Sequence, residues 1–176
     1  MKIFVLISVI FLLGSTDRSK ENDRRLKSAV RSESIENIEK LIKKGANTNL
    51  LVSTGRSLLM EAAFKGNLKI VKLLVKNGAN VSFVGKNNQT PLIQSTKKEN
   101  LEIVKFLVGS GANVNQKTNA GTTALKIAVL SENVKIIEVL LKGGAETNLS
   151  AFTGESINEL ARKSRNAEVR KLFIGK

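Results

Sequence analysis

The chain has 176 residues, of which 41% are hydrophobic and 25% are charged, a composition typical of a folded domain rather than a disordered segment. It contains no histidine and no cysteine, which excludes disulfide bonds and the usual zinc sites and removes the commonest acid–base catalyst at neutral pH. Its formal net charge of +14 attracts acidic partners without identifying them.

The first predicted element is an N-terminal signal peptide over residues 1–16. Lys2 precedes an apolar run over residues 3–13, and small polar residues follow. A basic start, a short apolar core and a small-residue exit are typical of secretory signals. The run is short for a membrane span, which needs about 20 apolar residues. We therefore expect a secreted or periplasmic protein with no membrane span after signal removal; an uncleaved anchor or a buried strand stays open as the alternative.

A fixed period of 33 residues organises the rest of the chain. The stretch GANTN at 45–49 recurs as GANVS at 78–82, GANVN at 111–115 and GAETN at 144–148. A hydroxyl residue and an asparagine repeat at the same interval: Ser57, Thr90, Thr123 and Ser156, and Asn67, Asn100, Asn133 and Asn166. Three landmarks in one phase indicate a repeat architecture.

Each unit is predicted to contain two helices. Ser57 or Thr90 can cap the first helix, because its hydroxyl accepts a hydrogen bond from an unpaired backbone N–H, and Pro91 suits the first helical position. Gly-Asn at 66–67 ends that helix, and a second helix follows with a broad apolar face that must pack against more than one neighbour. Gly78 ends the second helix in a left-handed conformation, and the following asparagine bridges the backbone of the loop.

These landmarks resemble the ankyrin repeat, with the pattern G-x-TPLH-x-AA-x-x-G-N-x-x-IVK-LL-x-x-GA-x-x-N over roughly residues 20–176; Gly55–Ser82 matches it best. The resemblance implies an all-α ankyrin-repeat solenoid of stacked helix–loop–helix units with projecting hairpin loops. The ankyrin domain would occupy residues 17–176. Its expected parts are an N-terminal cap at 17–44, internal repeats at about 45–77, 78–110 and 111–143, and a C-terminal cap at 144–176. Terminal units of such arrays need polar outer faces.

The chain departs from the family pattern at several positions. One unit keeps the proline and none keeps the histidine, and Asn158 replaces an expected leucine. The aspartate usual near the loop tip is replaced by Val52, Gly85, Thr118 and Ala151. These departures leave the stability of individual loops open, whereas the fold follows from the period.

In ankyrin proteins the contact surface usually comprises the loop tips and the exposed side of the first helix. Carried over by position, the candidate partner-binding residues are Arg56, Phe64, Lys65, Lys86, Lys97, Lys98, Leu130, Phe152 and Lys163. The phenylalanines are the expected anchors, because aromatic residues contribute much of the energy at interfaces. The basic positions predict a groove for a protein with an acidic surface. The alternative interpretation is solvated lysine on a soluble array.

The sequence does not favour an enzyme. It shows no nucleophile beside a positioned base, no GxxxxGK[ST] loop and no clustered metal ligands, so we expect no catalysis, no cofactor and no metal, although carboxylate or lysine chemistry stays formally open. The matches to the glycosylation sequon at 80–82, 88–90 and 148–150 fall at positions that the repeat itself requires.

The charge keeps a second function in consideration, the electrostatic binding of polyanions such as nucleic acid, an anionic membrane or a glycan. Nucleic acid is disfavoured, because few aromatic residues are present for base stacking and because export separates the chain from it. We expect a monomer that binds another protein.

Overall fold

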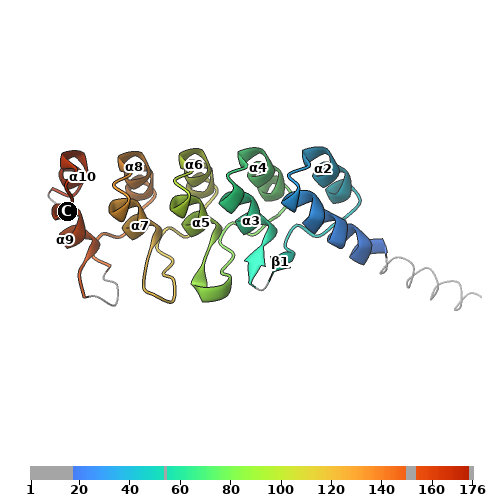
Figure 1. The fold of residues 1–176 in the computed structure, drawn as a ribbon, viewed down its shortest axis with the longest axis horizontal. Helices are drawn as coiled ribbons and strands as arrows, with labels where there is room; N and C mark the ends of the chain where they lie inside the picture. Colours follow the sequence, from blue (N-terminus) through green and yellow to red (C-terminus); the bar gives the residue numbers. More distant parts are fainter. Residues whose placement is uncertain (1–17, 54, 150–153, 175–176) are drawn as a thin grey trace, which may run out of the picture.

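The computed structural model describes residues 18–53, 55–149 and 154–174, and it is an extended array of helix pairs. Figure 1 shows two rows: α2, α4, α6, α8 and α10 lie in one, and α3, α5, α7 and α9 lie in the other, with the connecting loops projecting beyond the second row. Residues 18–31 are helical and pair with α2. The helices that follow are α2 (Ile35–Lys43), α3 (Leu58–Lys65), α4 (Leu68–Lys76), α5 (Pro91–Lys97), α6 (Leu101–Gly109), α7 (Ala124–Leu130), α8 (Val134–Lys142), α9 (Ile157–Arg162) and α10 (Ala167–Leu172).

The first helix of each later unit begins where the hydroxyl landmark predicts. Ser57, Thr90 and Thr123 are the N-caps of α3, α5 and α7, and each side chain accepts a hydrogen bond from the backbone N–H three residues on. Ser156 does the same for α9 and forms a full capping box with Glu159. A hydroxyl cap stabilises a helix by about 1 kcal/mol, which matters for helices of six to eight residues. The predicted caps are confirmed.

The core is a continuous layer between the helix rows, and both helices of each unit contribute to it. Ile70, Val71 and Leu74 of α4 are fully buried, and the residues 33 and 66 positions later are buried in the same way in α6 and α8. Each of these side chains contributes about 1.5–3 kcal/mol by leaving water. Because one helix touches the units before and after it, burial is shared along the array and no unit has a closed core of its own.

The repeated Gly-Ala-Asn stretch joins each unit to the next. Gly78 has φ of 85°, a left-handed conformation that glycine adopts without a steric penalty. Asn49 reaches from the unit before: its Oδ1 accepts from the N–H of Asn80 at 2.8 Å, and its Nδ2 donates to the carbonyl of Gly78 at 2.9 Å. We call this line of contacts the asparagine ladder. It continues at each later junction through Ser82 and Asn115, whose side-chain oxygens accept from the N–H groups of Asn113 at 3.1 Å and Glu146 at 2.9 Å.

The loops form short hairpins. β1 (Leu51–Ser53) pairs antiparallel with β2 (Arg56–Ser57), and η1 (Lys86–Asn88) forms the tip of the next loop. The N–H of Lys86 donates to the carbonyl of Gly55 at 3.0 Å, so neighbouring loops are also bonded to each other. A Cβ at Gly85 would lie 2.0 Å from that same carbonyl oxygen, which explains why a glycine stands at this position.

The loop departures from the family pattern are accommodated in three different ways. Val52 is buried, Gly85 allows the close approach of two loops, and the hydroxyl of Thr118 accepts from the N–H of Thr122 at 3.1 Å. The fourth position, Ala151, lies outside the described residues, as does the predicted signal peptide. In the part of the chain that the structure describes, no helix is long and apolar enough to cross a membrane.

Candidate functional site

The predicted partner-binding residues lie on the row of first helices and on the loops beside it. Phe64 and Lys65 are on α3, Lys97 is on α5, Leu130 is on α7, and Lys98 and Lys163 are the C-caps of α5 and α9. Arg56 is on β2 and Lys86 is on η1. We call this side of the array the loop edge. Phe152, the second expected anchor, lies outside the described residues.

Phe64 is the centre of a cluster that spans two units. The guanidinium carbon of Arg56 lies 4.9 Å from the centroid of the Phe64 ring, and the ammonium of Lys98 lies 4.3 Å from it. Both distances fall within the range of cation–π attraction, which contributes about 0.5–1 kcal/mol at exposed sites. The ring is half-buried, so part of it stays accessible. We call Arg56, Glu61, Phe64 and Lys98 the Phe64 cluster.

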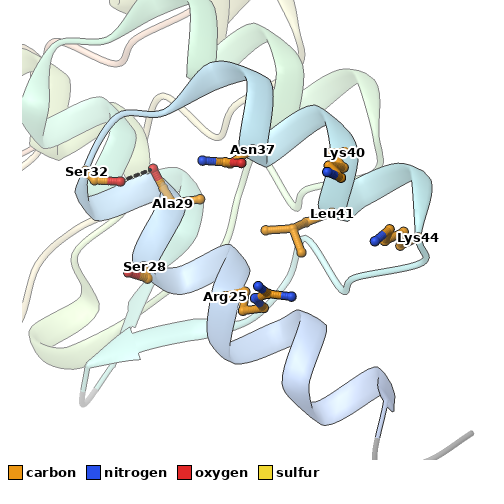
Figure 2. A pocket seen from close by; sticks show the side chains of 8 residues that line it. All are labelled: Arg25, Ser28, Ala29, Ser32, Asn37, Lys40, Leu41 and Lys44. Atoms are coloured by element: carbon orange, nitrogen blue, oxygen red, sulfur yellow. Dashed lines mark hydrogen bonds between the residues drawn. The ribbon is translucent and has the colours of Figure 1, made fainter.

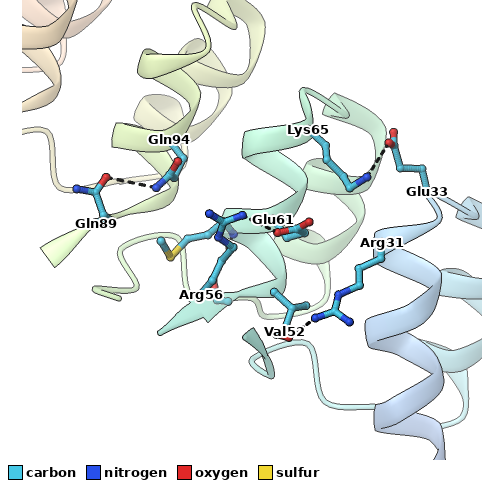
Figure 3. A network of polar contacts seen from close by, with 10 residues as sticks. Arg31, Glu33, Val52, Arg56, Glu61, Lys65, Gln89 and Gln94 are labelled. Atoms are coloured by element: carbon cyan, nitrogen blue, oxygen red, sulfur yellow. Dashed lines mark hydrogen bonds and ion pairs between the residues drawn. The ribbon is translucent and has the colours of Figure 1, made fainter. Parts of the chain in front are cut away.

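The two cations of the Phe64 cluster differ in their pairing. Nη1 of Arg56 lies 3.0 Å from Oε2 of Glu61, whose side chain is 15% exposed, so the charge of Arg56 is largely matched within the chain (Figure 3). Among the described residues, no carboxylate pairs with Lys98. Lys98 therefore offers its charge to an incoming group, whereas Arg56 contacts the ring while it is paired with Glu61.

Two further predicted cations are paired with acids of this chain. Lys65 is paired with Glu33 of the preceding unit (Figure 3), and the two groups are 3.3 Å apart; Lys163 lies 2.6 Å from Glu155. The hydrogen bond that Lys163 donates to Glu155 raises the pKa of Lys163, and hydrogen bonds donated by Asn67 and Lys65 lower the pKa of Glu33. These pairs reduce the positive potential at their positions below what the sequence composition indicates.

The remaining basic positions stay without an ion pair in the described part of the chain. Lys86 is exposed on η1. Lys97 donates to the side-chain oxygen of Gln89 at 3.0 Å. The amide of Gln94 donates to the same oxygen at 3.3 Å, a contact drawn in Figure 3. Lys86, Lys97 and Lys98 therefore form a basic centre on the third unit, between the ion pairs of Lys65 and Lys163.

Leu130 and Lys163 come together at the other end of the loop edge. Both line a hollow of about 240 Å³ between the fourth and fifth units, with Val129 and Leu160 among its apolar walls. Leu130 is 60% exposed, which is unusual for a side chain of its size in this protein. The hollow is a second place where an apolar group of a partner could be covered.

Sequence reasoning missed two apolar residues on the loops. Leu51 is 42% exposed and Val84 is 44% exposed, and they are equivalent positions in neighbouring units. Their signal in the sequence is an apolar side chain that stands at the same phase of the period in two successive loops. On the opposite row, the ammonium of Lys72 lies 5.8 Å from the centroid of the Phe106 ring.

The described residues contain no group of three or more acidic, histidine or cysteine side chains that could hold a metal ion. The loop edge presents amide, ammonium and apolar groups, and Glu33, Glu61 and Glu155 are ion-pair partners of its cations. This arrangement is suited to recognition of a surface.

A stacked array of helix pairs with projecting loops defines a class of non-globular binding scaffolds. Within that class, a family model described as ankyrin repeats in three copies matches residues 8–84, 26–118 and 59–151. The chain belongs to the ankyrin-repeat family, and ankyrin repeats are generally modules of protein–protein interaction. The first match begins inside the segment assigned to the signal peptide. A search of curated proteins finds no match.

Proposed function

We propose that this chain is an exported, non-catalytic, monomeric binding module whose loop edge engages a partner protein with an acidic surface. The observation that supports it most is the Phe64 cluster, in which an accessible aromatic ring is held between two cations from successive units. Export rests on the apolar run at residues 3–13 and is part of the same proposal.

The proposed contact combines an apolar anchor with a local charge. Phe64 covers an apolar group of the partner, and Lys86, Lys97 and Lys98 attract its carboxylates. Association costs entropy for every side chain that must be ordered. The ring of Phe64 is already fixed by Arg56 and Lys98, so less of this cost remains to be met on binding.

The experiment compares two triple variants of the full chain. Phe64→Ala with Lys97→Ala and Lys98→Ala removes the proposed contact. Phe106→Ala with Lys72→Ala and Lys76→Ala removes one half-buried ring and two exposed lysines from the opposite row and is the matched control. Each immobilised protein is incubated with the exported protein fraction of its cells, and retained proteins are identified by mass spectrometry.

We expect at least one acidic protein to be retained by the wild type and by the control and to be lost from the Phe64 variant. Thermal unfolding of both variants establishes that the arrays remain folded. Equal retention by the two triple variants would show that the loop edge is not the site. Cell fractionation of a tagged chain, with and without residues 2–16, tests export separately.

The net charge of +14 supports a second candidate, an electrostatic binder of polyanions. Such binding weakens steeply with salt, because each neutralised phosphate releases counterions. Titration of duplex DNA, heparin and vesicles of phosphatidylglycerol at several salt concentrations separates the two proposals. A steep salt dependence that is equal in both triple variants would favour the polyanion binder over the loop-edge module.

A further inference from the structure

A pocket lies at the N-terminal end of the array, away from the loop edge. Its volume is about 290 Å³, and it is formed between the helix at 18–31 and α2. Figure 2 shows the side chains that line it, with Leu41 directed into the space between the two helices. The complete lining is Arg25, Ser28, Ala29, Ser32, Asn37, Lys40, Leu41 and Lys44. We call it the end pocket.

The end pocket occupies the face on which a preceding unit would pack. Asn37 and Lys40 stand 33 positions before Ile70 and Leu73, and Arg25 stands 33 positions before Leu58. Ile70 and Leu58 are fully buried, whereas Asn37, Lys40 and Arg25 are exposed. Among the described residues, no unit covers this face. Where the later units have an apolar packing surface, the first unit therefore has a hollow with a polar rim.

The rim has only one sign of charge. A cap that needs only to be soluble can mix acids and bases, and this unit has acids available, since Glu21, Glu36 and Glu39 are all exposed. None of these acids lines the pocket, whereas Arg25, Lys40 and Lys44 do.

Two of the three cations on the rim are unpaired in the described chain. Arg25 lies 3.8 Å from Glu21, with both side chains more than half exposed, so that pair is weak. No ion pair involves Lys40 or Lys44 among the described residues. The positive charge of the rim is therefore available to an external anion.

The floor of the pocket is apolar and belongs to the packed core. Ala29 is 6% exposed and Leu41 is 7% exposed, and both belong to the hydrophobic core. Ser28 and Asn37 add polar groups beside the rim. The hydroxyl of Ser32 already donates to the carbonyl of Ala29 at 3.3 Å, so the backbone at the floor is partly satisfied within the chain. The arrangement is a cationic ring above a small apolar base.

We propose that the end pocket binds a phosphate monoester, with Arg25, Lys40 and Lys44 around the phosphate oxygens and the carbon portion against Ala29 and Leu41. A guanidinium presents paired N–H groups that match phosphate geometry, and lysine adds point charges that adjust to it. The same chemistry occurs in soluble phosphate esters and in the head group of phosphatidic acid. The end pocket lies on the first unit, whereas the residues of the loop edge begin on the second, and the proposal does not depend on the proposed function.

The test uses the full chain and two charge-matched triple variants. Arg25→Gln, Lys40→Gln and Lys44→Gln remove the three cations of the rim. Lys69→Gln, Lys76→Gln and Lys142→Gln remove the same charge from exposed positions on α4 and α8. Glycerol 3-phosphate is titrated by calorimetry at low salt, and vesicles of phosphatidylcholine with and without phosphatidic acid are used for sedimentation.

We expect saturable binding by the wild type and by the control, and binding weaker by about tenfold or more in the rim variant, because charged hydrogen bonds are removed. Binding of glycerol 3-phosphate identifies a soluble ester as the source; binding only to vesicles with phosphatidic acid identifies the lipid. Equal loss in the two triple variants, or no saturable binding in either arm, would overturn the proposal. If the rim variant does not fold, Lys44→Gln alone is compared with Lys142→Gln.

Discussion

In the first four units of the array, the turn between the two helices is built in two different ways. In the second unit the turn contains Gly66, with φ of 81°. In the first, third and fourth units the same position holds Glu33, Glu99 and Glu132, whose φ values of 58°, 55° and 53° lie in the left-handed region that glycine prefers. A glutamate in this conformation is strained, so something must compensate for it.

The compensation is a hydrogen bond to the following unit. The amide of Asn67 donates to Glu33 at 2.9 Å, and the amide of Asn133 donates to Glu99 at 3.1 Å. Glu132 accepts from the hydroxyl of Ser164 at 2.5 Å and from the N–H of Arg165 at 3.1 Å.

At Gly66 no carboxylate is available, and Asn100, unlike its counterparts, makes no side-chain cap bond. At Gly66 the left-handed backbone is unstrained, but the turn lacks the carboxylate hydrogen bond to the next unit. At the three glutamates the backbone is strained, and each side chain accepts a hydrogen bond from the next unit. The junction between the second and third units is therefore held at this turn without a glutamate.

Removing the most highly bonded glutamate should have the largest effect. Glu132→Ala leaves a left-handed residue without its bonds to Ser164, Arg165 and Asn166. We expect amide exchange in α9 and α10 to accelerate by about tenfold or more while α3 stays protected, because units of an array open with their nearest neighbours. Hydrogen-exchange mass spectrometry measures this. Glu138→Ala, on the exposed surface of α8, is the control for loss of one charge; uniform acceleration throughout the array would contradict the idea of a local tie.

Changing the relaxed turn should have an intermediate effect. Gly66→Ala places a Cβ on a residue with φ of 81°, 3.0 Å from the amide nitrogen of Asn100. Gly45→Ala meets the same φ with no atom within 4 Å. We expect a cost of about 1–2 kcal/mol for the conformation in both variants, with the larger loss at Gly66. Chemical denaturation measures it, and equal losses would show that Asn100 moves aside without cost.

Acid should weaken the bonded turns gradually and leave the Gly66 turn unchanged. The hydroxyl of Ser164 and the N–H groups of Asn166 and Arg165 lower the pKa of Glu132 below its ordinary value of 4.5, and Asn67 and Lys65 lower the pKa of Glu33. A lowered pKa in the folded state adds stability that is complete above pH 4.5 and is lost as the pH falls through the folded-state value.

The expected result is a fall in melting temperature below about pH 4.5 that is shallower in a Glu33→Gln, Glu132→Gln double variant. Melting curves from pH 7 to pH 3 measure it. Because Glu102 and Glu159 also have lowered pKa values, part of the fall should remain in the double variant. An unchanged slope would show that these two carboxylates contribute nothing to the acid dependence.

The period and the caps made the fold predictable from the sequence. Ser57, Thr90, Thr123 and Ser156 cap helices because a hydroxyl at that phase satisfies a backbone donor wherever it occurs. The left-handed glutamates were not predicted, because glutamate has no intrinsic preference for that conformation and the compensating partner lies 32–34 residues away. Their signal was available in the phase, since Glu33, Glu99 and Glu132 stand where Gly66 does.

The candidate site was predictable only in part. Position in the repeat placed Phe64 and Lys98 on one edge, but the ring contact between them depends on side-chain rotamers in two units. The pairing of Lys65 with Glu33 likewise joins residues 32 positions apart, so counting charges overstated the basic character of the edge. Whether Phe152 and the signal peptide act as expected stays a prediction.

The polar outer face of the first unit has a consequence for how a gene of this kind can lengthen. An extra copy inserted between two interior units meets apolar surfaces on both sides, because residues equivalent to Ile70 and Leu74 are buried in each of them. A copy added before the first unit would meet Arg25, Asn37 and Lys40 instead and would bury unpaired charge. Tandem duplication is therefore compatible with folding in the interior of the array, whereas extension at this end would first require those three residues to change.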